Sequence, residues 1–292
     1  MYTLFTIVCC IATLKTTAAY TSMQDFFPEV FQHGNLSEVT WDHAVNSKQL
    51  LTDALANDKH MIEADVLIGY LINSNPRELT VIMGHPPIII SDLSLEQFLN
   101  TVIAHNADPT KRKKGVKLDF KGSDAYAKAM SGGFLLNTDE TAFREEFTKF
   151  PLWINGDIAK GPAENWNNGV DLQLAQMKSK PAVINAATWS LGWTTGNYQE
   201  GTTYTMEQIN AMKTTVQGIA NVTFPVRAMY AAKSREAMVA LLDVGTLTIW
   251  SGKQDDEHVD VAQLAKLIAD YLDKVYVDVP DTLWQRLRDA MH

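Results

Sequence analysis

The chain has 292 residues, of which 46% are apolar and 20% are charged. This composition is typical of a globular protein and excludes a disordered or fibrous chain. The formal net charge of −9 argues against a non-specific nucleic-acid binder, because a phosphate backbone needs a positively charged face.

Residues 1–19 are typical of a secretory signal peptide. The apolar run Leu4–Leu14 is too short to span a bilayer, and Thr17–Ala19 supplies small residues for cleavage. We therefore expect a secreted, extracellular protein without a transmembrane segment, whose mature chain begins near Tyr20. Both cysteines, Cys9 and Cys10, would be removed with the signal, so the mature protein should contain no disulfide. Two sequons, which begin at Asn35 and Asn221, are candidate glycosylation sites.

Residues 20–38 form an N-terminal extension to which the sequence assigns no structure, and residues 39–292 read as a single domain. Short apolar runs alternate with helical segments along this domain, which indicates βαβ units and a parallel sheet. The predicted strands are Val39–Ala44, Met61–Ile68, Thr80–Gly84, Gly115–Lys121, Leu152–Ile158, Val183–Trp189, Thr223–Ala228 and Leu247–Ser251. A further run, Lys274–Val279, could be a ninth strand, in which case one of these eight assignments is wrong.

Three helices have readable starts. Ser94, Thr205 and Asp260 each precede a glutamine by three residues and an apolar-periodic run by one or two, a pattern typical of a helix N-terminus. Eight strands that alternate with helices predict an α/β fold of the (β/α)8 TIM-barrel type. An open doubly wound sheet is the alternative, but no Gly-x-Gly-x-x-Gly or phosphate loop follows any predicted strand.

Two carboxylates stand out in the run His60–Ile68. Glu63 and Asp65 are two residues apart, so in a strand they project from the same face, while Ile62 and Ala64 face the other way. Adjacent carboxylates repel each other unless a cation or a shared proton relieves the repulsion. Two surface acids on a solvated edge strand are the simpler interpretation.

A second set of charges alternates with apolar residues in the run GVKLDFK. Lys117, Asp119 and Lys121 would share one face of a strand, and three charges cannot face the inside of a barrel without partners. Asp119 could complete a three-oxygen site with Glu63 and Asp65, which would suit a hard cation such as Mg²⁺ or Ca²⁺. A salt-bridge ladder on an exposed strand is the alternative.

Polar or aromatic side chains close most of the other predicted strands. Because chemistry in a (β/α)8 barrel lies at the C-terminal ends of the strands, these side chains are candidates for the functional site. They are His43, His85, Asn155, Arg227 and Trp250.

Eight segments in order resemble the menorin family (family with sequence similarity 151). They are WDHAVNSKQLL, MIEADVLI, MGHPP, GVKLDFK, LWINGDI, SLGWTTG, FPVRA and LTIWSGK. That family is in turn similar to the phospholipase-C-like phosphodiesterase barrels, which include glycerophosphodiester phosphodiesterases and the spider-venom sphingomyelinase D group.

The resemblance implies roles for individual residues. His43 and His85 would be the catalytic acid/base pair, Glu63, Asp65 and Asp119 would bind the metal, and Lys121 would contact phosphate. We add Lys117, Asn155, Arg227 and Trp250 as candidate contacts for the substrate or its phosphate. The Arg-Gly that follows the first His in glycerophosphodiesterases is absent, and Pro86 follows His85 where Asp is usual, so the resemblance does not fix the substrate.

Two functions remain open at this stage. The first is a secreted, metal-dependent phosphodiesterase that acts on a phosphodiester or a (lyso)phospholipid-type molecule. The second is a non-catalytic extracellular ligand or adhesion factor, with a protein partner in tissue or neuronal patterning, that keeps the barrel without turnover.

Overall fold

The computed structural model describes residues 21–72, 74, 78–131, 133–163, 169–252 and 254–292. The predicted signal sequence, residues 1–19, lies outside this set. The strands are β1 (Trp41–Asp42), β2 (Met61–Leu71), β3 (Thr80–Met83), β4 (Ile90–Ser91), β5 (Gly115–Phe120), β6 (Leu152–Lys160), β7 (Thr188–Thr194), β8 (Val222–Arg227), β9 (Thr246–Trp250) and β10 (Val275–Asp278).

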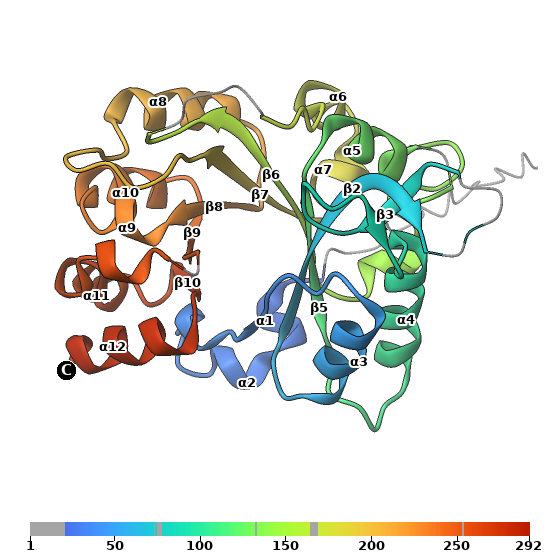
Figure 1. Cartoon of the computed structure of the whole chain (residues 1–292), viewed down its shortest axis with the longest axis horizontal. Helices are drawn as coiled ribbons and strands as arrows, with labels where there is room; N and C mark the ends of the chain where they lie inside the picture. Colours follow the sequence, from blue (N-terminus) through green and yellow to red (C-terminus); the bar gives the residue numbers. More distant parts are fainter. Residues whose placement is uncertain (1–20, 73, 75–77, 132, 164–168, 253) are drawn as a thin grey trace, which may run out of the picture.

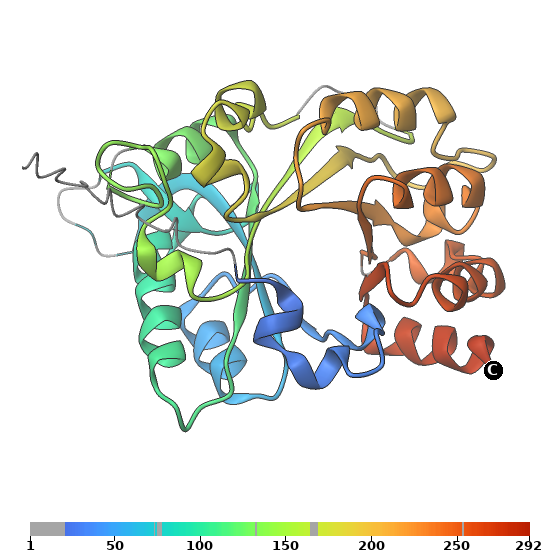
Figure 2. The same cartoon turned by 180° about the vertical axis from the view of Figure 1, so that it is seen from behind.

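Helices cover the strands from outside (Figures 1 and 2). The α-helices are α1 (Met23–Phe26), α2 (Pro28–Phe31), α3 (Lys48–Ala56), α4 (Leu95–Ala107), α5 (Ser123–Met130), α6 (Leu174–Lys178), α7 (Pro181–Ile184), α8 (Met206–Thr215), α9 (Ala228–Ala231), α10 (Arg235–Leu242), α11 (Val261–Asp270) and α12 (Asp281–Met291). Three short 3₁₀ helices are η1 (Leu36–Glu38), η2 (Glu145–Thr148) and η3 (Asp256–His258). Ser94, Thr205 and Asp260 cap α4, α8 and α11 as the sequence predicts, each accepting a hydrogen bond from the backbone N–H of a glutamine.

Eight parallel strands form a nearly closed barrel, in the order β1-β2-β5-β6-β7-β8-β9-β10. The first and last strands meet through side chains: the rings of Trp41 and Tyr276 are 6.4 Å apart, and His43 Nδ1 is 3.4 Å from Asp278 Oδ2. The predicted α/β barrel of the TIM type is therefore confirmed.

One predicted barrel strand is wrong. β3, predicted as Thr80–Gly84, pairs antiparallel with β2 and lies outside the barrel, and β10 takes its place as the eighth barrel strand. The reason is the length of β2. Its first six residues pair with β5, whereas its outer part, Val66–Gly69, pairs antiparallel with β3 in a hairpin. Apolar alternation identifies a strand but does not identify its partner.

Two further strands differ from their predicted bounds. The range predicted as Val183–Trp189 begins within α7, where Pro181 occupies the first turn of a short helix, and β7 starts only at Thr188. β1 contains only Trp41 and Asp42.

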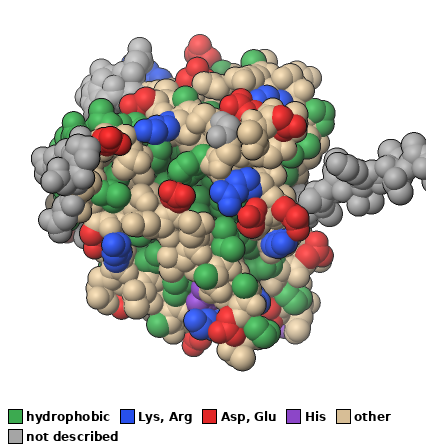
Figure 3. All heavy atoms as spheres, turned by 90° about the vertical axis from the view of Figure 1, so that its right-hand side faces the viewer, with side chains coloured by type: hydrophobic (Ala, Val, Ile, Leu, Met, Phe, Trp, Pro, Cys, Tyr) green, Lys and Arg blue, Asp and Glu red, His purple; other side chains and the backbone are tan. Residues whose placement is uncertain are grey.

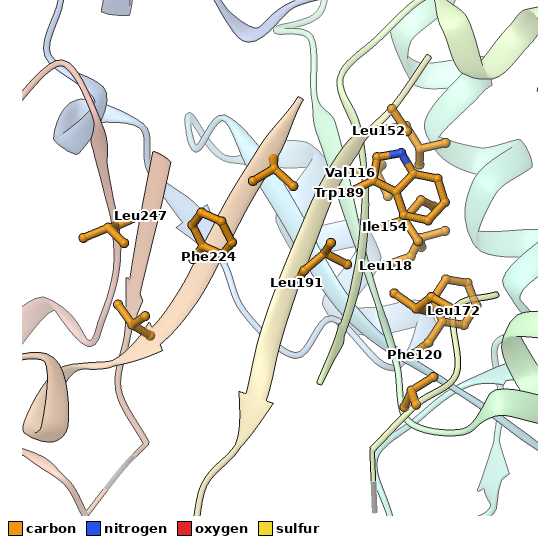
Figure 4. Close-up of a cluster of buried hydrophobic side chains, with 14 of the residues drawn as sticks. Val116, Leu118, Phe120, Leu152, Ile154, Leu172, Trp189, Leu191, Phe224 and Leu247 are labelled. Atoms are coloured by element: carbon orange, nitrogen blue, oxygen red, sulfur yellow. The ribbon is translucent and has the colours of Figure 1, made fainter. Parts of the chain in front are cut away.

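Alternate residues of each barrel strand face the helices and the barrel interior. The outward residues Val116, Leu118 and Phe120 of β5 pack with residues of β6 and β7 in the large apolar cluster beneath the helices (Figure 4). The inward layer is polar, and Ser190, Thr223 and Thr248 in it are fully buried.

The residues before β1 close the floor of the barrel. Phe27 of the α1–α2 junction and Leu36 of η1 join a second apolar cluster with Trp41, Trp153 and Tyr276 of the strands. The extension that the sequence left without structure is thus packed against the barrel. Among the described residues, no helix is both long enough and apolar enough to cross a membrane.

His60, immediately before β2, lies against this floor. Its ring centroid is 5.1 Å from that of Phe27, and its Nε2 is 2.6 Å from Nη2 of Arg112. Burial, together with the positive charge of Arg112, lowers the pKa of His60 to about 4.

We expect the contribution of His60 to the free energy of unfolding to fall as the pH drops from about 6.5 to about 4. Over that range the unfolded chain binds a proton at His60 and the folded chain does not, so this contribution increases with pH. The variant His60→Asn should flatten this part of the profile in urea denaturation, whereas His33→Asn, at an exposed position, should not. Equal slopes in the wild type and His60→Asn would contradict the assignment.

Candidate functional site

Neighbouring strands place the predicted acids side by side. Glu63 and Asp65 of β2 are in register with Lys117 and Asp119 of β5. Asp119 is in turn in register with Asn155 of β6. The polar faces of three adjacent strands therefore meet inside one end of the barrel.

The three predicted metal ligands converge. Glu63, Asp65 and Asp119 each offer a carboxylate oxygen, and these oxygens lie within 4.8 Å of one another. Glu63 is 1% exposed and Asp65 5%, so neither is the solvated surface acid of the simpler interpretation.

Each carboxylate has one oxygen held by an N–H group. The backbone N–H of Ala44 donates to Glu63 Oε2 over 2.7 Å, and Ala44 itself has a φ of 55°, a backbone region that non-glycine residues rarely adopt. The remaining donors are the side-chain amides of Asn46 to Asp65 Oδ2 and of Asn155 to Asp119 Oδ1, each over 2.7 Å. These bonds fix the orientation of the carboxylates before any ligand binds.

Lys121 lies between two of the acids. Its Nζ is 2.6 Å from Asp119 Oδ2 and 3.1 Å from Asp65 Oδ1. Burial alone would lower the pKa of Lys121, but the two carboxylates outweigh it and raise this pKa above its usual value. Burial would likewise raise the pKa of Asp119, whereas the attraction of Lys121 and Lys117 holds it below its usual value. Lys121 and Asp119 therefore carry their charges at neutral pH.

His43 follows β1 and contacts two carboxylates. Its Nδ1 is 3.3 Å from Glu63 Oε2 and 3.4 Å from Asp278 Oδ2. Glu63 raises the pKa of His43 to about 10 against the opposing effect of burial, and burial raises the pKa of Glu63 to about 7. The shared proton thus resides on the imidazole at neutral pH, and Nε2 is the nitrogen left to face a ligand.

Asp278 was missed in the sequence. It ends β10, is 6% exposed, and lies 3.8 Å from Lys117 Nζ as well as beside His43. Burial alone would raise the pKa of Asp278, but the hydrogen bond and charge of His43 lower it. The signal was available, since Asp278 closes the KVYVDV run in the way that other polar residues close their strands.

His85 reaches the site from outside the barrel. It comes from the connection between β3 and β4, not from the end of a barrel strand as predicted. Its side chain is exposed, and its Nδ1 is 2.6 Å from the carbonyl oxygen of Pro86. His85 and His43 nevertheless line the same cavity.

The other predicted contacts are distributed at different depths. Lys117 is 4% exposed and its Nζ lies 5.7 Å from the centre of the Trp41 ring, near the floor cluster. Asn155 accepts a hydrogen bond from the Ser190 hydroxyl over 2.5 Å. Trp250 lies at the mouth and lines the cavity.

The guanidinium of Arg227 forms its hydrogen bonds with other residues of the chain. Nε and Nη2 donate to the two oxygens of Asp255 over 2.8 and 2.7 Å, and Nη1 donates to the carbonyl of Gly196 over 2.8 Å. The guanidinium also lies 5.3 Å from the centre of the Trp250 ring. Arg227 therefore joins the loops that follow β7 and β9, and it lies outside the set of residues that line the cavity.

The cavity has a volume of about 530 Å³. The polar wall of the cavity contains Asp157 of β6 together with groups described above, which are His43, Asn46, Asp65, His85, Lys117, Asp119, Lys121 and Asn155. Pro86, Phe120, Val170, Pro225 and Trp250 form the apolar part. Three convergent carboxylate oxygens fit a hard divalent cation such as Mg²⁺ or Ca²⁺, which binds oxygen ligands. The ammonium of Lys121 contacts two of these carboxylates.

Comparison with known proteins identifies relatives along most of the chain. Residues 35–284 match the Menorin N-terminal domain. The human protein FAM151B is 35% identical over 253 residues, which cover 83% of this chain and 83% of the human protein. Among solved structures, the crystal structure of a glycerophosphoryl diester phosphodiesterase from Parabacteroides distasonis is similar with a TM-score of 0.45 and 10% identity, covering 94% of this chain and 92% of that chain. The chain therefore belongs to the menorin family.

Proposed function

We propose that the protein is a secreted, divalent-cation-dependent phosphodiesterase. The observation that carries this proposal is the convergence of the Glu63, Asp65 and Asp119 carboxylates. Asp65 and Asp119 line the same cavity as His43 and Lys121. A divalent cation held by the three carboxylates would neutralise phosphoryl oxygens and act as a Lewis acid. Mg²⁺ and Ca²⁺ both suit the all-oxygen donor set.

The remaining groups match the needs of phosphoryl transfer. Lys121, at the cavity wall, would hold the anionic phosphoryl oxygens beside the cation. His43 contacts Glu63 and Asp278 through Nδ1 and lines the cavity. A cation bound to Glu63 would offset the negative charge that raises the pKa of His43, so that the neutral imidazole could act as nucleophile or take the proton of the attacking hydroxyl at Nε2. His85 would donate the proton that the leaving alkoxide needs when its ester P–O bond breaks.

The attacking group forms the new P–O bond. If water attacks, the products are an alcohol and a phosphomonoester, whereas an internal hydroxyl of the substrate would give a cyclic phosphate. The apolar wall formed by Phe120, Pro225 and Trp250 suits the organic part of a phosphodiester, including a glycerophosphodiester or a lysophospholipid.

We expect Asp65→Asn to abolish both cation binding and turnover, because the variant removes one of three charged ligands at a buried site. The measurements are calorimetric titration with Mg²⁺ and Ca²⁺, and product release from a panel of glycerophosphodiesters and lysophospholipids. Chelation with EDTA should stop turnover and added cation should restore it. Glu236→Gln, on the exposed face of α10, is the charge-matched control and should behave like the wild type. Turnover that persists unchanged in EDTA would contradict the metal-dependent mechanism.

A further inference from the structure

The two aspartates of the site are already paired with a cation that belongs to the chain. Lys121 Nζ contacts Asp119 Oδ2 at 2.6 Å and Asp65 Oδ1 at 3.1 Å. The other oxygen of each carboxylate accepts a side-chain amide N–H, from Asn155 and Asn46 respectively. The ammonium thus contacts the two carboxylate oxygens that accept no amide N–H, and these are the oxygens that a metal would bind.

The ammonium is the movable member of this arrangement. Asp65 and Asp119 lie in register on paired strands and are held by their amide donors, so they cannot turn away from each other. Lys121 follows the last residue of β5, its side chain is 23% exposed, and it lines the cavity. A lysine has a flexible four-carbon stem, so its ammonium can move into the cavity while the carboxylates stay in place.

We propose that Lys121 is a built-in counter-ion that competes with the divalent cation for Asp65 and Asp119, and thereby couples cation binding to phosphate binding. A divalent cation that binds the carboxylates displaces the ammonium into the cavity, where it can pair with a phosphate anion. An anion that draws Lys121 away frees the carboxylates in turn. The coupling must be reciprocal, because each ligand changes the affinity for the other by the same factor.

This inference rests on the proposed function, since it assumes that the carboxylates bind a divalent cation. It also goes beyond that function, because a lysine that serves only the phosphate would leave the intrinsic affinity for the cation unchanged or would weaken it through charge repulsion alone. Competition for the same oxygens predicts that metal affinity depends on what occupies the cavity.

The test measures Mg²⁺ affinity by calorimetry on the full protein, with and without inorganic phosphate. In the wild type, phosphate should tighten Mg²⁺ binding by about 5- to 150-fold, the usual range of such couplings. Lys121→Met should bind Mg²⁺ about 10-fold more tightly than the wild type without phosphate. Phosphate should then tighten Mg²⁺ binding by a smaller factor than in the wild type, because only its direct contact with the cation remains. Lys121→Arg keeps the positive charge and should retain the coupling. Lys266→Met, at an exposed position of α11, controls for the change in net charge.

Thermal unfolding covers the case in which Lys121→Met folds poorly without metal. Loss of the ammonium leaves Asp65 and Asp119 facing each other without a counter-ion, so Mg²⁺ should raise the Tm of Lys121→Met more than that of the wild type. Equal or weaker Mg²⁺ binding by Lys121→Met overturns the inference, while the metal site stands if Asp65→Asn has lost binding. If neither the wild type nor Lys121→Met binds Mg²⁺, both the inference and the proposed function fall.

Discussion

Replacement of His43 by alanine is expected to lower turnover by about 10²- to 10⁴-fold, the contribution of a positioned proton-transfer group. Cation binding should be nearly intact, because the Asp65 and Asp119 carboxylates keep their amide donors and the imidazole is not needed as a ligand. The separation of the two effects is the informative result. It would distinguish a catalytic histidine from one that only supports the metal site.

The measurements are initial rates on a phosphodiester substrate and calorimetric Mg²⁺ titration of the same preparations. Asp278→Asn keeps the imidazole but removes one of the two carboxylates at Nδ1, so its rate should fall between those of the wild type and His43→Ala. His33→Ala, at an exposed position outside the cavity, should have no effect. Full activity of both His43→Ala and His85→Ala in an extracellular binding assay, with no turnover by the wild type, would favour a non-catalytic ligand over an enzyme.

The position of the site in the fold was predictable because strands alternate faces. Glu63, Asp65 and Asp119 follow a two-residue period against apolar neighbours, which places them on inward faces once the strands are known. Their convergence required only that the two strands be neighbours in the barrel, and β2 and β5 are. The alternation of strand faces and the order of strands in the barrel together therefore predict the cluster of three carboxylates.

The errors have a different origin. A strand pattern does not show which edge the strand joins. The sequence alone therefore places β3 in the barrel and His85 at the end of a barrel strand, whereas β3 pairs antiparallel with β2 outside the barrel. The sequence also does not show how deep a side chain lies in the cavity. Lys117 and Lys121 both line it, but the Lys117 side chain is 4% exposed beside the floor and that of Lys121 is 23% exposed. Both properties depend on residues distant in sequence.

The exposed apolar residues around the β2–β3 hairpin were not predicted from the sequence. Ile72, Leu79, Ile88 and Ile89 are 49–65% exposed, and all four lie outside the predicted strands. On the face of the molecule shown in Figure 3, hydrophobic side chains reach the surface between acidic and basic ones. Apolar periodicity predicts packing only where a second element covers the face.

Arg227 has a partner within the protein that its residue type and position do not reveal. An arginine at a strand end beside a phosphate site suggests an anion contact, and the sequence supported that expectation. In the structure the guanidinium forms a two-pronged ion pair with Asp255, which is 5% exposed and also accepts the backbone N–H of Gly252. The contact is therefore expected to support the mouth loops rather than to bind substrate directly.

Arg227→Met should accordingly lower the free energy of unfolding by about 3 kcal/mol, the cost of leaving one partner of a buried ion pair unpaired. The Arg227 side chain is 14% exposed, which places the effect at the lower end of the range for buried pairs. Arg227→Lys should also lower the free energy of unfolding, but by less than Arg227→Met, because a lysine keeps the charge but cannot pair with both oxygens of Asp255 at once. Chemical denaturation gives these values.

The double variant Arg227→Met/Asp255→Leu distinguishes the cost of one unpaired buried charge from the cost of losing the whole ion pair. Once both charges are removed, no unpaired charge remains buried, so the double variant should be more stable than Arg227→Met alone. Lys149→Met is the control, since Lys149 and Glu145 form a 3.0 Å pair with side chains 63% and 76% exposed, and such pairs contribute less than about 1 kcal/mol. If Arg227→Met costs no more than Lys149→Met, the guanidinium is not held by Asp255 in solution, and it is again a candidate to bind a phosphate at the mouth.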